Sequence, residues 1–208
     1  MEISITRSLN ELKLLEARIN RAITEGTYVA LQIGNNKING HMSVEDFNKS
    51  AEAYDKKVKD LIRRRSAIKA AIVESNAVTT VSVSNEEMTV AQAIDEKNAI
   101  GYKKSYLHQL RSQYTLALRK LESENETVKV RLDKHLETSL GKDAKGKEDQ
   151  VTLLTNSFNE LNRAKLVDPL NLKAQIEALQ EHIEGFESEV DFILSESNTR
   201  TLITIPDN

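Results

Sequence analysis

The stretch from Val90 to Leu140 contains one glycine, Gly101, and no proline, and no other feature of the chain restricts the fold as strongly. Glycine and proline are the residues that most disfavour a helix interior, so these residues are predicted to form one very long helix. At 1.5 Å per residue, about 50 residues would span roughly 75 Å. Gly101 and 122–126 are the candidate places for a partial break. Only two prolines and seven glycines occur among 208 residues, which favours a mainly α fold.

Two other segments repeat apolar residues at alternating spacings of three and four. This is the heptad pattern of a helix that packs on a nearly parallel partner, so we expect elongated antiparallel hairpins or a bundle with a thin core. Ser43 is the predicted N-cap of the first segment, and Arg65 is the one residue that interrupts its apolar seam. The first seam comprises Val44, Phe47, Ala51, Tyr54, Val58, Leu61, Arg65, Ile68 and Ile72, and the second comprises Leu172, Ile176, Leu179, Ile183, Phe186, Val190 and Ile193.

Three short segments have β-strand character. Apolar residues alternate in TYVALQI, and β-branched residues dominate VTTVSV and TRTLITI. Because unpaired backbone groups need partners, we expect the strands at about 28–33, 78–83 and 199–205 to form one small sheet at one end of the bundle. The segment 141–150, GKDAKGKEDQ, is predicted to be an exposed flexible tip of a single domain spanning 1–208.

Two predicted helices end in nearly the same way, with VESNAVTTVSV at 73–83 and SESNTRTLITI at 195–205. Asn often adopts the left-handed conformation that closes a helix, so Asn76 and Asn198 are predicted to be C-caps. On a structural interpretation, two matching helix–cap–strand units place their strands in one sheet. On a functional interpretation, the shared end of the bundle is a binding site.

Several arginines lie close to these two helix ends. A run of charge on a helix is usually solvated surface, but the heptad position of Arg65 points inward. There it would pair with Glu187 or Glu189, or line a cavity or a contact between subunits. Guanidinium and amide donors suit a small anion. The predicted ligand-binding residues are Arg64, Arg65, Asn76, Asn198 and Arg200.

Motifs for catalysis are absent from the sequence. Without cysteine there is no disulfide, thiolate metal site or cysteine nucleophile, and the four histidines show no metal-ligand spacing. No glycine-rich phosphate loop or nucleophile elbow is present. We therefore predict a protein that is not an enzyme and that has no cofactor and no metal.

Charge and hydropathy restrict the partners. The 29 basic and 32 acidic residues give a net charge of −3, which argues against a general nucleic-acid binder. No uncharged run approaches the length of a membrane-spanning helix, and the N-terminus lacks the apolar block of a signal peptide. We expect a cytoplasmic protein with no membrane partner.

The segments "MTVAQAIDEKNAI" at 88–100 and "DPLNLKAQIEALQEHIEGFESEVDFILSESNTRTLITI" at 168–205 complete a recognisable pattern. With the Asn-containing helix end and the Thr-bearing extended segment before them, they resemble the septicolysin-like family. These are small helical proteins of bacteria and phages whose biochemistry is uncharacterised. The resemblance covers nearly the whole chain, implies a phage or prophage origin, and brings no catalytic residues with it.

Three functions follow from these observations. The leading hypothesis is a homo-oligomeric phage protein that holds a small anionic ligand between subunits, as a sponge for a nucleotide-type immune signal in the host cytoplasm. The alternative is a virion structural or assembly component, or a helical scaffold. A membrane-active, cytolysin-like protein, which the family label suggests, ranks below both because no segment could form a spanning helix or a barrel strand.

Overall fold

The mainly α fold expected from the sequence is confirmed. The computed structural model describes residues 1–35, 37–38, 41–141 and 147–206, and within them it contains five helices and four short strands. Five residues of the predicted tip, 142–146, lie outside the described residues. The elements are β1 (Glu2–Ser4), α1 (Ile5–Glu25), α2 (Val44–Val78), β2 (Thr80–Val83), β3 (Glu86–Thr89), α3 (Val90–Leu140), α4 (Glu148–Asn162), α5 (Leu172–Arg200) and β4 (Leu202–Thr204).

The chain divides into two compact units. The first unit consists of Met1–Asn98 and Gly185–Asn208, and the second consists of Ala99–Glu184. Helices α3 and α5 therefore contribute residues to both. That the whole of 1–208 acts as a single domain stays a prediction.

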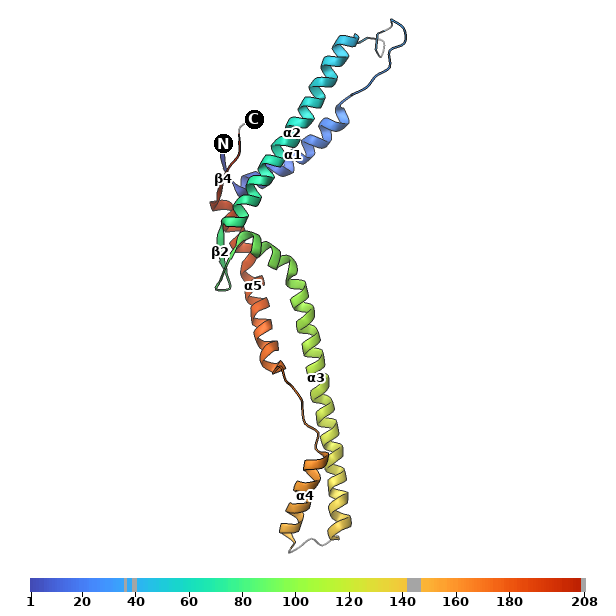
Figure 1. Cartoon of the computed structure of the whole chain (residues 1–208), viewed down its shortest axis with the longest axis vertical. Coiled ribbons are helices and arrows are strands. Elements are labelled where there is room, and N and C mark those ends of the chain that lie inside the picture. Colours follow the sequence, from blue (N-terminus) through green and yellow to red (C-terminus); the bar gives the residue numbers. More distant parts are fainter. Residues whose placement is uncertain (36, 39–40, 142–146, 207–208) are drawn as a thin grey trace. The chain divides into compact units, whose positions relative to one another are not determined.

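In the first unit, α1 and α2 lie side by side as a helical hairpin (Figure 1). Ser4 caps α1, because its side chain accepts a hydrogen bond from the backbone of Arg7. The buried residues of α1 follow each other at heptad spacing, and Leu15 among them packs with Ile68 and Ile72 of α2. Full burial of each such side chain stabilises the fold by about 1.5–3 kcal/mol. The buried positions of α1 are Ile5, Ser8, Leu15, Ile19 and Ala22.

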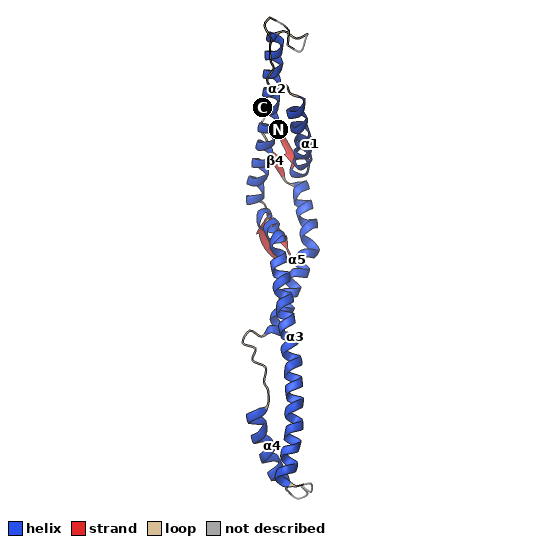
Figure 2. Ribbon diagram, turned by 90° about the vertical axis from the view of Figure 1, so that its right-hand side faces the viewer, coloured by secondary structure: helices blue, strands red, loops and turns tan. Residues whose placement is uncertain are grey.

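The first and last strands close this unit. Strands β1 and β4 are antiparallel, with Ile3 opposite Ile203 (Figure 2). The pairing continues past the strands, since the amino group of Met1 donates to the carbonyl of Ile205 at 2.9 Å and the amide of Ile205 donates to the carbonyl of Met1 at the same distance. Ile203 and Ile205 are buried in the cluster that contains Ile68, so this sheet covers the α1–α2 hairpin.

The predicted single sheet is wrong in its pairing. The two β-prone repeats do form strands, β2 and β4, but each pairs with a different neighbour: β2 with β3 and β4 with β1. The segment 28–33 is not a strand within the chain. For β2 the physical reason lies in chain length, because a two-residue turn brings β3 alongside it, whereas a β2–β4 pair would close a much longer loop. For β4 the reason is burial, since pairing with β1 places Ile203 and Ile205 in the core cluster.

The turn between β2 and β3 is a tight hairpin whose central residues, Ser84 and Asn85, have φ of 51° and 65°. Positive φ at both positions defines the type I′ turn, which matches the twist of a two-stranded ribbon. Glu189 of α5 accepts a hydrogen bond from the backbone of Ser84 at 2.8 Å, which anchors the turn. Directly after the hairpin, Thr89 and Gln92 form a capping box at the start of α3.

In the second unit, α4 packs on the C-terminal part of α3 (Figure 1). The ring of Phe158 stacks on His135 with centroids 5.3 Å apart. Asn125 holds the chain just after α4: its side chain donates to the carbonyl of Ala164 at 3.2 Å and accepts from the amide of the same residue at 3.0 Å. One side chain therefore satisfies both backbone groups of a residue that has left its helix.

The predicted long helix is confirmed, since α3 is helical from Val90 to Leu140 without a break. The predicted seam of α5 is confirmed as well, because every one of its positions is buried or half-buried. Helix α5 begins at Leu172, and Asp168 accepts from the amide of Leu172 at 2.9 Å, so it caps the helix through an intervening turn.

Candidate functional site

The two repeated segments, 73–83 and 195–205, end their helices with the same hydrogen bond. The amide of Thr79 donates to the carbonyl of Ser75 at 2.9 Å, and the amide of Thr201 donates to the carbonyl of Ser197 at 2.9 Å. Strands β2 and β4 begin one residue later in each case. The two segments are thus equivalent helix–strand units, as the sequence repeat predicts.

The predicted Asn caps are wrong. Asn76 lies inside α2 and Asn198 lies inside α5, and neither has a positive φ. The residue that ends α2 is Thr79, with φ of −75° and ψ of 123°, which is an extended conformation. A left-handed residue reverses the chain, but here each helix continues directly into a strand, and a β-branched residue adopts that conformation readily.

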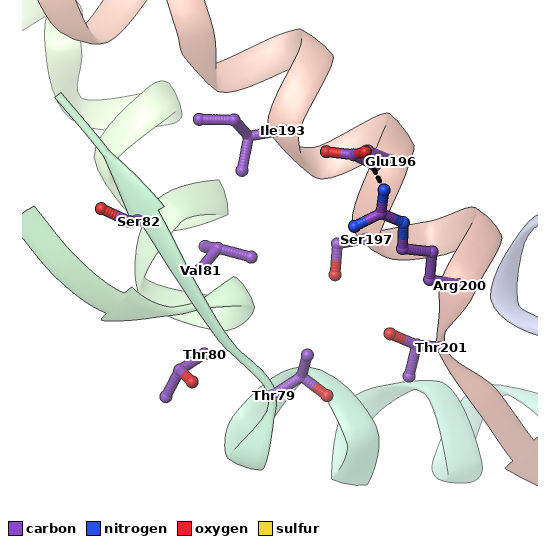
Figure 3. A pocket seen from close by; sticks show the side chains of 9 residues that line it. All are labelled: Thr79, Thr80, Val81, Ser82, Ile193, Glu196, Ser197, Arg200 and Thr201. Atoms are coloured by element: carbon purple, nitrogen blue, oxygen red, sulfur yellow. Dashed lines mark ion pairs between the residues drawn. The ribbon is translucent and has the colours of Figure 1, made fainter. Parts of the chain in front are cut away.

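A cavity lies between the two repeats, and all of its lining residues belong to the first unit (Figure 3). Its volume is about 360 Å³. Ser197 and Thr201 point toward it from the α5 side, and Thr79 lies at its base. Hydroxyl groups dominate the lining, which consists of Thr79, Thr80, Val81, Ser82, Ile193, Glu196, Ser197, Arg200 and Thr201.

The electrostatics of this cavity are close to neutral. Its two charged residues, Arg200 and Glu196, pair with each other at 2.5 Å, and the side chain of Arg200 is 76% exposed. Each repeat also brings a helix C-terminus to the cavity, and a helix C-terminus carries a partial negative charge. An exposed ion pair next to two such ends does not concentrate positive charge. The cavity therefore offers a ligand mainly hydroxyl donors and acceptors, with the paired guanidinium of Arg200 at its edge.

Arg64 is engaged elsewhere. Its Nε donates to one carboxylate oxygen of Glu11 at 2.9 Å and a terminal nitrogen donates to the other at 3.4 Å. A further nitrogen donates to the carbonyl of Pro206 at 3.4 Å. This half-buried arginine joins α1, α2 and the C-terminal strand segment, so its role is structural.

The predicted inward position of Arg65 is wrong, because Arg65 is exposed. Both Arg64 and Arg65 lie within about 60° of Leu61 around the helix, so heptad spacing alone does not distinguish them. The acidic partner determines which of the two arginines turns inward, and Glu11 of α1 lies on the side of Arg64. Of the two proposed acidic partners of Arg65, Glu189 instead accepts the hydrogen bond from Ser84.

The structure therefore brings only Arg200 of the predicted set to the cavity. The residues that sequence reasoning missed are the hydroxyls Thr79, Ser197 and Thr201. A signal for them was present, because Ser75 and Thr79 in the first repeat stand where Ser197 and Thr201 stand in the second. Asn76 shows a different anomaly: its buried Oδ1 has no hydrogen-bond partner among the described residues.

Comparisons of the chain with models of known families, with curated proteins and with solved structures found no match. In the part of the chain that the structure describes, no cluster of three or more histidine, aspartate and glutamate side chains could hold a metal ion. No helix among those residues has the length and apolar character needed to cross a membrane.

Proposed function

We propose that this chain is a non-enzymatic helical scaffold or assembly protein that acts by associating with further copies of itself. The observation that supports this proposal is a second heptad seam on α3, which we call the outer seam. Its nine positions are all exposed and alternate in steps of four and three. They are Tyr102, Tyr106, Gln109, Gln113, Leu116, Lys120, Ser123, Thr127 and Val130.

The outer seam is separate from the face of α3 that packs within the chain. At about 100° per residue, the two faces are about 120° apart around the helix. The inner face is already covered, since Leu107, Leu110 and Val128 are buried. The four apolar or aromatic residues of the outer seam are between 52% and 81% exposed. Uncharged polar side chains and Lys120 fill the positions between these four, so the outer seam is a mixed surface with the spacing of a helix that packs on another helix.

The charges of the outer seam favour an antiparallel pair of α3 helices. Lys120 is the one charged residue among the nine positions. In a parallel pair each Lys120 would face its own copy, whereas an antiparallel pair centred between Gln113 and Leu116 places Lys120 opposite Gln109. The remaining contacts join apolar and uncharged polar side chains, so none of them brings two like charges together.

A charge at the centre of the outer seam tests the proposal. We expect Leu116→Glu to weaken self-association at least about tenfold, because burying leucine contributes about 1.5–3 kcal/mol. Thr115→Glu is the matched control, since it adds the same charge at the exposed residue directly before Leu116, which lies outside the outer seam. Sedimentation velocity over a concentration series measures both. Equal association of the two variants would contradict the proposal.

A second function, capture of a small polar ligand, has support from the cavity between the two repeats. The hydroxyls of Ser197 and Thr201 and the guanidinium of Arg200 could bind the oxygen atoms of a nucleotide-type molecule. Arg64, Arg65, Asn76 and Asn198 take no part in this version of the site. An origin in a phage, and the resemblance to septicolysin-like proteins, stay predictions.

Calorimetry with cyclic dinucleotides and ADP-ribose-type nucleotides tests ligand capture. If the cavity binds one of them, Ser197→Ala and Arg200→Ala should each weaken binding, because each removes a donor that the ligand uses. Arg63→Ala is the control, since Arg63 is exposed and pairs with Asp60 away from the cavity. No heat of binding with any member of the panel would count against this function.

A further inference from the structure

The connection between α1 and α2 holds a run of large apolar side chains in solvent. Val29, Leu31 and Ile33 are between 77% and 88% exposed. None of these three residues makes a hydrogen bond to another described residue. Every second residue from 29 to 33 is a large apolar one, which is the pattern of one face of a β-strand. A protein rarely leaves such a group of apolar side chains uncovered.

We propose that residues 28–33 form a β-strand whose positions 29–33 pair with the same positions of a second copy of this chain. The pairing is antiparallel about a two-fold axis at Leu31. It makes a two-stranded sheet between subunits, so the strand that the sequence predicts forms on assembly. This interface belongs to the first unit, and it does not rest on the outer seam of α3.

The distribution of charge around Leu31 favours a second copy as the occupant. From Gly26 to Asn36 the sequence contains no charged residue. The first charges on either side are Glu25 and Lys37, each six residues from Leu31 and of opposite sign. A two-fold antiparallel pair therefore places Glu25, at the end of α1, and Lys37 of the second copy beyond the same end of the paired strands. The segment is complementary to itself in charge.

The side chains define the register. Residues directly opposite each other in an antiparallel pair point to the same face. With the axis at Leu31, Val29 lies opposite Ile33 of the second copy and Leu31 lies opposite itself, so all apolar residues gather on one face. A shift by one residue would place Val29 beside Gln32 of the second copy and split that face. The hydrophobic pattern and the charges thus select the same axis.

Cysteine cross-linking tests this register, and the chain contains no cysteine of its own. In the Leu31→Cys variant the two sulfur atoms meet at the axis, because opposed Cα atoms are about 4.5–5.5 Å apart, within disulfide range. We expect a disulfide-linked dimer to be the main product of mild oxidation. Val29→Cys is the matched control: it is equally exposed, but its copies lie four residues apart along the strands, about 14 Å.

Selective cross-linking of Leu31→Cys supports the pairing, whereas equal cross-linking of both variants reports random collision and overturns it. Hydrogen exchange of the wild-type strand supplies a second measurement. We expect the amides of 28–33 to gain protection as the concentration rises, and to do so equally in the Leu116→Glu variant. Fast, concentration-independent exchange in these amides overturns the proposal. This result is independent of whether the outer seam of α3 associates.

Discussion

At the scale of single residues, the side chain of Arg64 joins three separate segments of the first unit. It contacts Glu11 of α1 through two nitrogens and the carbonyl of Pro206 after β4. Planar guanidinium matches a carboxylate in this two-bond geometry, and lysine could not reproduce it. The pair is mostly shielded from solvent, so it is screened less than an exposed ion pair.

Removal of the Glu11 charge should therefore loosen the α1–α2 hairpin. We expect Glu11→Gln to lower the free energy of unfolding of this unit by about 1 kcal/mol, and the difference should shrink at high salt. Urea denaturation followed by circular dichroism, together with hydrogen exchange in α1 and α2, measures the effect.

The neighbouring arginine is the control for this variant. Arg65→Ala removes an exposed side chain and should change stability by less than about 0.5 kcal/mol. If Arg65→Ala were the more damaging of the two substitutions, the assignment of Arg64 as the structural residue would be contradicted.

At the scale of helices and strands, local chemistry was enough to predict most of the elements. Ser43 caps α2 as expected, and Thr89 with Gln92 caps α3 in the same local way, because a cap needs only residues that are close in sequence. The seam of α5 was also predictable, since heptad spacing is a local property.

Interactions between distant segments were not predictable in the same way. The choice between Arg64 and Arg65 depends on Glu11, which lies more than fifty residues away. The pairing of β4 with β1 depends on both ends of the chain meeting. Asn76 and Asn198 failed as caps because the following strands take the chain onward, and propensity gives no information about that direction.

A cavity lies between the two repeats, but most of the residues that line it are not the predicted ones. That this cavity binds a ligand stays a prediction. The choice of arginines and asparagines rested on their charge and cap chemistry, whereas Thr79, Ser197 and Thr201 reach the cavity because of where the two helices end. Hydroxyl side chains are common, so their presence in a sequence identifies a site only when the fold places them together.

At the scale of the whole molecule, the two proposed interfaces lie in different units, the strand 28–33 in the first and the outer seam in the second. Each interface is a two-fold contact of a surface with itself. One such contact closes a dimer, whereas two different ones with separate two-fold axes link dimers to each other. A scaffold with both surfaces should therefore form assemblies larger than a dimer.

Variants that block one interface at a time separate the two contributions. We expect Leu31→Lys and Leu116→Glu each to reduce the assembly to a dimer, and the double variant to be a monomer, because each charge stays unpaired in one contact. Val73→Lys with Thr115→Glu is the matched double control, since both residues are exposed outside the proposed surfaces. Size-exclusion chromatography with light scattering measures the masses. A double variant with the mass of the wild type would show that neither surface holds the copies together, whereas a wild type no larger than a dimer would mean that at most one of them does.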